Sequence, residues 1–279
     1  TSGSRMLKRW ICYPERSQHE ASLRHAAVRE LGELPDTSWI SALQYCGDTE
    51  RVVARVGLQT AKPKDLVVLR NAIAQLPTLQ AGLAGCESER LQSIHRTFDG
   101  SEAVLKLLQT WLLEDPRSNI KDGGVIAPGV DTELDECKEL LLNADGVLKN
   151  MEEKERAATG INNLKIQYNR NSGYTIEVSN GQVDKVPVHY QRKQTLKNME
   201  RYTTAELREF ENKALTAQDR SLKREKYLYE SLLGMLQKHV PWIAAMTHGI
   251  SQLDILANFS HQAKQWNYSA PVFSSTPGL

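Results

Sequence analysis

The sequence predicts a mainly α-helical protein: a helical bundle core, two long antiparallel helices that leave and rejoin it, and a small β-rich tip at their distal end. Three observations support this fold class. Apolar residues recur at spacings of three and four through most of the chain, the middle alternates apolar and polar residues, and a long helical pattern then returns. At 279 residues, with 40% hydrophobic and 25% charged residues, the chain can bury a sizeable core.

The N-terminal part of the chain carries helical patterns only. Four helices are expected, over residues 17–31, 48–60, 62–77 and 102–113. Gly32 and Pro35 end the first of them, and the third begins at Pro63 and ends at Pro77, as proline suits a helix start and interrupts a helix interior.

A long helix is expected next, because one narrow apolar stripe has heptad spacing. The stripe consists of Leu134, Cys137, Leu141, Ala144, Leu148 and Met151. It then runs into a polar segment, which indicates an end that projects into solvent. A return helix over 203–240 and a last helix over 250–264 complete the pattern. The alternative is that the two long helices pack inside one compact globule, with the β-hairpin as a surface decoration.

The β-rich tip is predicted from alternation. Leu164, Ile166 and Tyr168 share one face of a strand, and Tyr174, Ile176 and Val178 share one face of the next. Turn residues stand between the two runs and after the second, as in a hairpin. Apolar residues are few here, so we expect the tip to be the most mobile part of the protein.

A basic segment follows this hairpin in a chain whose net charge is only +1. Lys and Arg neutralise phosphates, while Thr, Asn and Gln add neutral hydrogen bonds to the same oxygens. If a helix began here, its free N–H groups would add an anion site. The candidate phosphate-binding residues are Arg192, Lys193, Gln194, Thr195, Lys197, Asn198 and Arg201, joined from neighbouring turns by Arg170, Asn171, Ser172, Ser179 and Asn180. The simpler alternative is a solvated basic patch.

No motif indicates an active site, a cofactor site or a metal site. The spacing of Gly124 and Gly129 matches a phosphate-binding loop, but Val130 and Asp131 stand where that loop needs Lys and Ser or Thr. There is no HExxH, no GxSxG and no zinc-like cluster of Cys and His. We therefore expect no enzymatic activity, no bound cofactor and no metal.

The four cysteines are far apart, and neither a signal peptide nor a transmembrane run is apparent. A cytoplasmic protein with reduced thiols and no membrane partner is expected. The ends of the chain, "TSGSRM" and "SSTPGL", suggest a piece of a longer protein.

Six segments together give a resemblance that covers essentially the whole chain. They are "GSRMLKRWI", "DTERVVARVGLQTAKPKDL", "DGGVIAPGVDTELDE", "NLKIQYNRNSGYTIEVS", "RKQTLKNMERYTTAEL" and "LDILANFS". In this order and spacing they resemble the core (lever) and clamp domains of the MutS family of DNA mismatch repair proteins. The resemblance implies lever segments over 1–145 and 211–279 and a clamp over 146–210.

In that family the clamp closes over duplex DNA and contacts its backbone, so the resemblance assigns the residues of "RKQTLKN" and Arg201 to the DNA-facing segment. It also implies that the full-length protein is a homodimer that works with other mismatch repair proteins. The Phe-x-Glu motif with which the family reads a mismatch does not occur in this sequence. The family's connector domain and its ATP- and magnesium-binding C-terminal domain have no counterpart here either.

The resemblance thus implies a module that binds the DNA backbone and is monomeric by itself. The competing hypothesis is a helical scaffold whose stalk and tip bind protein partners. Retention on heparin at low salt would distinguish the two, because only a phosphate-binding surface needs the basic segment.

Overall fold

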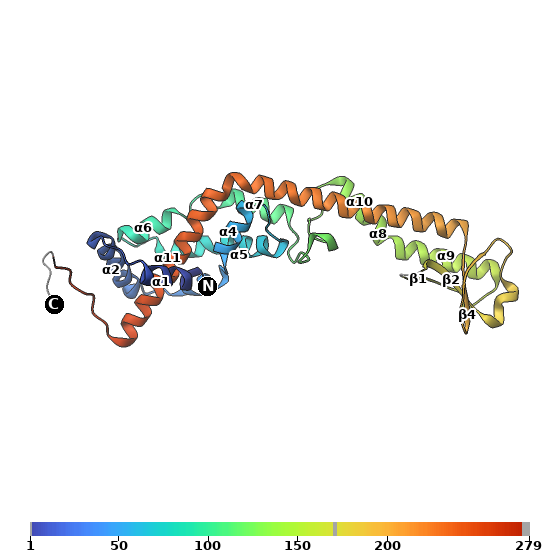
Figure 1. Cartoon of the computed structure of the whole chain (residues 1–279), viewed down its shortest axis with the longest axis horizontal. Helices are drawn as coiled ribbons and strands as arrows, with labels where there is room; N and C mark the ends of the chain where they lie inside the picture. Colours follow the sequence, from blue (N-terminus) through green and yellow to red (C-terminus); the bar gives the residue numbers. More distant parts are fainter. Residues whose placement is uncertain (1, 170–171, 275–279) are drawn as a thin grey trace. The chain divides into compact units, whose positions relative to one another are not determined.

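The computed structural model describes residues 2–169 and 172–274, and the chain forms two compact units (Figure 1). Unit 1 comprises 1–127 and 228–279, and unit 2 comprises 128–227. Helices dominate both units, and a small four-stranded antiparallel sheet lies in unit 2. The predicted fold class, mainly α with a small β insertion, is confirmed.

Unit 1 is a bundle organised around two long helices. Its helices are α1 (Ser2–Cys12), α2 (Gln18–Glu33), α3 (Ser38–Tyr45), α4 (Thr49–Gly57), α5 (Pro63–Leu83), α6 (Glu89–Arg96), α7 (Glu102–Trp111) and α11 (Val240–Trp266), with short 3₁₀ turns at Ile120–Asp122 and Gln237–His239. Helix α5 packs against α3, α4, α6 and α7, while α11 packs against α1, α2, α4 and α6. Both helices therefore bury apolar residues on several sides, such as Leu69 and Ile73 of α5 and Met246 and Leu253 of α11.

The expected end of the third helix at Pro77 is wrong, because α5 continues through this proline to Leu83. Proline removes one backbone hydrogen bond and costs about 3 kcal/mol in a helix interior. Leu76, Leu79 and Leu83 keep the apolar pattern on both sides of it, and all three are buried. Burying such side chains stabilises the helix by about 1.5–3 kcal/mol each, which outweighs the proline.

Unit 2 begins with two helices where one was expected. Helices α8 (Thr132–Leu142) and α9 (Ala144–Thr159) are separated at Asn143 alone. The predicted apolar stripe continues across this break, because Leu134, Cys137, Ala144 and Met151 are all buried. The return helix, α10 (Ala205–Leu236), begins in the same unit.

Ion pairs fix the antiparallel arrangement of these helices within unit 2. Arg224 Nη2 lies 2.6 Å from Asp131 at the start of α8, whereas Lys154 Nζ near the end of α9 lies 3.1 Å from Glu206 in the first turn of α10. The start of α8 thus lies beside a late part of α10, and a late part of α9 lies beside the start of α10. The prediction that the two long helical segments run antiparallel is confirmed.

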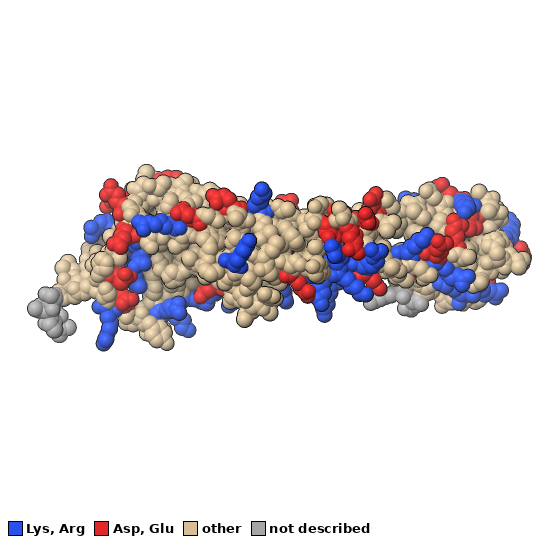
Figure 2. All heavy atoms as spheres, turned by 90° about the horizontal axis from the view of Figure 1, so that it is seen from above, with Lys and Arg blue, Asp and Glu red and all other residues tan. Residues whose placement is uncertain are grey.

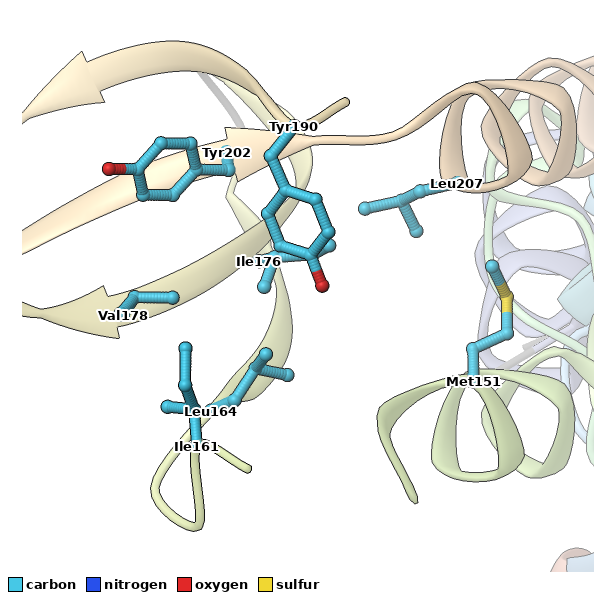
Figure 3. Close-up of a cluster of buried hydrophobic side chains, with 8 residues drawn as sticks. All are labelled: Met151, Ile161, Leu164, Ile176, Val178, Tyr190, Tyr202 and Leu207. Atoms are coloured by element: carbon cyan, nitrogen blue, oxygen red, sulfur yellow. The ribbon is translucent and has the colours of Figure 1, made fainter. Parts of the chain in front are cut away.

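The sheet has its own buried cluster, which we call the tip core (Figure 3). It consists of Met151, Ile161, Leu164, Ile176, Val178, Tyr190, Tyr202 and Leu207. These side chains come from the middle of α9, the loop that follows the helix, two strands, a connecting loop and the start of α10. The expectation of few apolar residues in the tip is therefore wrong, since residues scattered along the sequence converge on one face of the sheet.

Candidate nucleic-acid interface

The sheet arranges its strands in the order β1-β2-β4-β3, all antiparallel. The strands are β1 (Lys165–Asn169), β2 (Gly173–Ser179), β3 (Gln191–Thr195) and β4 (Met199–Thr203), and a 3₁₀ turn, η2 (Asn180–Lys185), follows β2. Ile166 pairs with Ile176 and Tyr168 with Tyr174, so the alternation read from the sequence corresponds to one face. β1 and β3 are the two edges.

The basic segment forms a second hairpin rather than the start of a helix. Arg192 and Lys193 lie in β3, Lys197 lies in the turn, and Arg201 lies in β4. An anion site at a helix start is therefore absent from this segment. All five residues of β3 are exposed, because the strand forms the outer edge of the sheet beyond β4.

A β-bulge at Lys193 interrupts the pairing of β3 with β4. Arg192 pairs with Tyr202 and Gln194 with Arg201, which leaves Lys193 without a partner residue across the ladder. The Lys193 side chain turns towards α10. Its Nζ donates to the carbonyl oxygen of Ser172 at 3.1 Å and lies 3.5 Å from Glu211. Two of the candidate residues, Ser172 and Lys193, are thus brought together.

Arg192 and Arg201 also face carboxylates. Arg192 Nε lies 3.2 Å from Glu200, which in addition accepts a hydrogen bond from the Tyr202 hydroxyl. Arg201 Nε donates to Glu177 at 2.8 Å, and its Nη1 donates to Gln194 at 3.0 Å. The Arg201 side chain is only 15% exposed. This arginine consequently links β2, β4 and β3.

The remaining candidates gather at the other end of the second hairpin. The Asn180 side-chain amide donates to the carbonyl of Lys197 at 3.0 Å, and the Asn180 backbone N–H donates to the carbonyl of Asn198. Ser179 accepts a hydrogen bond from Asn163 at 2.9 Å. These contacts fix the turn while the side chains of Lys197 and Asn198 stay exposed.

Lys197 makes no ion pair with any residue in the described part of the chain, and Thr195, two residues before it, is exposed as well. Arg170 and Asn171 lie outside the described residues, so the structure gives no position for these two candidates.

Sequence reasoning did not identify Glu177, Glu200 and Glu211 as partners of the basic side chains. Glu200 was visible as one acid within the basic segment, but its burial follows from its pairing in β4. Glu177 and Arg201 are 24 residues apart, and only the antiparallel register of β2 and β4 brings them opposite each other. Figure 2 shows the result on one face, where Lys and Arg atoms over unit 2 lie beside Asp and Glu atoms rather than in one continuous patch.

A buried tyrosine joins the sheet to α9. The Tyr190 hydroxyl donates to Glu155 at 2.5 Å. Burial, and then the adjacent Glu155 carboxylate, raise the pKa of Tyr190 well above its ordinary value, so the hydroxyl stays protonated and keeps donating. The loop that leads into β3 is thereby attached to the helix.

Neither a metal site nor a membrane span is found in the described residues. Among residues 2–169 and 172–274, no three His, Cys, Asp or Glu side chains come together in a way that could hold a metal ion. Across the same residues, no helix combines the length and the apolar character that crossing a bilayer requires.

A known protein family matches most of the chain. The family described as MutS domain III matches residues 1–260, which includes every helix of both units and the whole inserted sheet apart from the last residues of α11. A match over this much of the chain is not confined to one motif. The chain therefore belongs to the MutS domain III family, that of the MutS-type mismatch repair proteins.

Proposed function

We propose that the chain is the DNA-clamping and lever module of a MutS-type mismatch repair protein, and that unit 2 contacts the backbone of duplex DNA without reading its sequence. One observation carries the proposal: β3 is an edge strand whose five residues are all polar and exposed, and it leads into a turn that presents Lys197. Membership of the MutS domain III family supports DNA as the partner.

The composition of this surface suits phosphate contacts rather than base contacts. Lys197 supplies a cation for a phosphate group. Neutral groups that can form hydrogen bonds with phosphate oxygens come from Gln194, Thr195 and Asn198. Such contacts position a protein on DNA but carry no sequence information. The affinity should be that of non-specific binding, on the order of 10⁻⁴ to 10⁻⁶ M at physiological salt.

The other activities of the family would reside outside this chain. We propose that ATP, magnesium and the main dimer contacts belong to other domains of the family's proteins, so that this chain is itself no enzyme. Contacts with other mismatch repair proteins would then involve the full-length homodimer. The α8, α9 and α10 segments, paired antiparallel, would serve as the levers that carry the sheet.

The test is a titration of a short fluorescein-labelled duplex, followed by anisotropy at several salt concentrations. Lys197→Ala should weaken binding to all duplexes alike. It should also reduce the steepness of the slope of log affinity against log salt concentration by roughly 0.9, because one phosphate is no longer neutralised. The matched control is Lys106→Ala, since Lys106 is an exposed lysine of α7 in unit 1 with no ion pair among the described residues.

An unchanged slope for Lys197→Ala would mean that this lysine does not face phosphate. If the unsubstituted chain shows no salt-dependent binding at all, the scaffold hypothesis takes the place of the DNA hypothesis. One observation favours the scaffold hypothesis. Arg192 and Arg201 are each paired with a glutamate, which leaves the sheet with little net charge.

A further inference from the structure

Three of the four basic side chains in the second hairpin are already paired with carboxylates of the same unit. Their separations increase in the order Arg201 to Glu177, 2.8 Å, Arg192 to Glu200, 3.2 Å, and Lys193 to Glu211, 3.5 Å. A phosphate that contacts one of these cations must compete with its carboxylate. The three pairs differ in how readily that exchange can occur.

Arg201 is the least exchangeable of the three. Its side chain is 15% exposed and that of Glu177 is 13% exposed, so the pair is largely shielded from solvent. The guanidinium also binds Gln194 on the neighbouring strand. Removing one partner of such a pair leaves a partly buried charge uncompensated. Arg201 therefore links neighbouring strands and stabilises the sheet.

The pairs made by Arg192 and Lys193 are different. The Arg192 side chain is 59% exposed, and that of Lys193 is 30% exposed at the end of a flexible four-carbon stem. Glu211 has a second contact that does not depend on the lysine, because its Oε1 accepts a hydrogen bond from the Tyr174 N–H at 3.2 Å. Glu211 thus stays in place when the lysine moves away.

We propose that Glu200 and Glu211 serve as internal counter-anions which DNA phosphates displace from Arg192 and Lys193, so that these two carboxylates limit the affinity of the sheet for DNA. This inference rests on the proposed function. It assigns to two acidic residues the role of limiting the affinity for DNA, whereas the proposed function gives them no role.

The exchange has a consequence for the salt dependence. A lysine that leaves Glu211 for a phosphate releases a cation from DNA, but the freed carboxylate attracts a cation in return, so the net release is small. Without the carboxylate, the same contact releases its counterion in full. Removing the charge of Glu211 should therefore steepen the salt slope by up to roughly 0.9 as well as raise the affinity.

The experiment compares Glu211→Gln with Glu209→Gln in the duplex titration. Both changes remove one negative charge from α10 within two residues of each other, but Glu209 pairs with Lys213 of the same helix rather than with the sheet. Glu211→Gln keeps an oxygen that can accept the Tyr174 N–H. It should tighten binding about two- to five-fold, the range of exposed ion pairs applied to this partly exposed pair, and Glu209→Gln should not.

A double-mutant cycle with Lys193→Ala isolates the pair. In the Lys193→Ala background, Glu211→Gln should no longer change either the affinity or the slope. Circular dichroism of each variant checks that the fold is retained, and Glu200→Gln provides a second, independent carboxylate should Glu211→Gln fail to fold. Equal effects of Glu211→Gln and Glu209→Gln, or an effect that survives in Lys193→Ala, would overturn the inference.

The counter-anion role and the proposed function can be refuted separately. If the unsubstituted chain binds DNA and Lys197→Ala weakens binding, but neither glutamate substitution at the sheet changes the affinity, only the counter-anion role is refuted. If the unsubstituted chain does not bind DNA with any salt dependence, the proposed function itself is refuted.

Discussion

Leu207→Ala should open the β-rich tip of unit 2. Leu207 lies in the first turn of α10, is completely buried, and belongs to the tip core. Truncating a buried leucine costs about 2–5 kcal/mol, depending on how far the surroundings can collapse into the space. Several side chains around the tip core, Leu148 and Phe210 among them, are only partly buried and can move inward. We therefore expect the lower part of that range, about 2–3.5 kcal/mol.

The suitable assay is hydrogen exchange of the backbone amides in β2 and β4, since a small cluster can open without unfolding the rest of the chain. At about 1.4 kcal/mol per factor of ten, these amides should exchange about 30- to 300-fold faster than in the parent. Leu215→Ala is the matched control, because Leu215 lies on the same helix but is 45% exposed. Its effect should stay below about 1 kcal/mol. Equal acceleration in the two variants would refute the role assigned to the tip core.

Three further predictions concern single positions. Gly173→Ala should destabilise the tip by more than about 1 kcal/mol in a denaturant titration, because Gly173 has φ +69° and an added Cβ would clash with a Glu211 carboxylate oxygen. The hydrogen bond from Arg224 lowers the pKa of Asp131. Asp131 therefore stabilises unit 2 above its unfolded-state pKa, and this contribution disappears as the pH falls through its folded-state pKa. Asp131→Asn should have a lower free energy of unfolding at neutral pH, and that free energy should fall less between neutral and acidic pH than in the parent. Burial raises the pKa of Cys46 to about 12, so iodoacetamide should modify this thiol at mildly alkaline pH only after unfolding in urea, as mass spectrometry of the peptides would show.

The helices and the first hairpin could be predicted because their signals are local. Apolar residues at spacings of three and four appear wherever a helix buries one face, and the alternation around Ile166 and Ile176 matches the register of β1 and β2. The bundle contains α1, α3 and α6 beyond the helices expected from the sequence. α3 and α6 are only eight residues long, too short for a clear period.

The second hairpin could not be predicted in the same way. β3 has no apolar residue, and it is a strand because β4 offers it a hydrogen-bonding edge rather than because of its own pattern. Its basic character indicated phosphate binding, but the acids Glu177 and Glu211 that face this hairpin come from other elements, β2 and α10. The partial burial of Glu177 beside Arg201, and of Glu211 beside Lys193, is a tertiary feature with no local signal.

The exposed edge of the sheet has a further consequence, for solubility. An edge strand with free N–H and C=O groups can pair with the same strand of another molecule, and charged side chains and bulges hinder such pairing. β3 has both devices, in Arg192 and in the bulge at Lys193. Alanine substitutions intended to weaken DNA binding would also remove this protection from the edge. Such variants should self-associate at high concentration, and light scattering would reveal it before any binding measurement is interpreted.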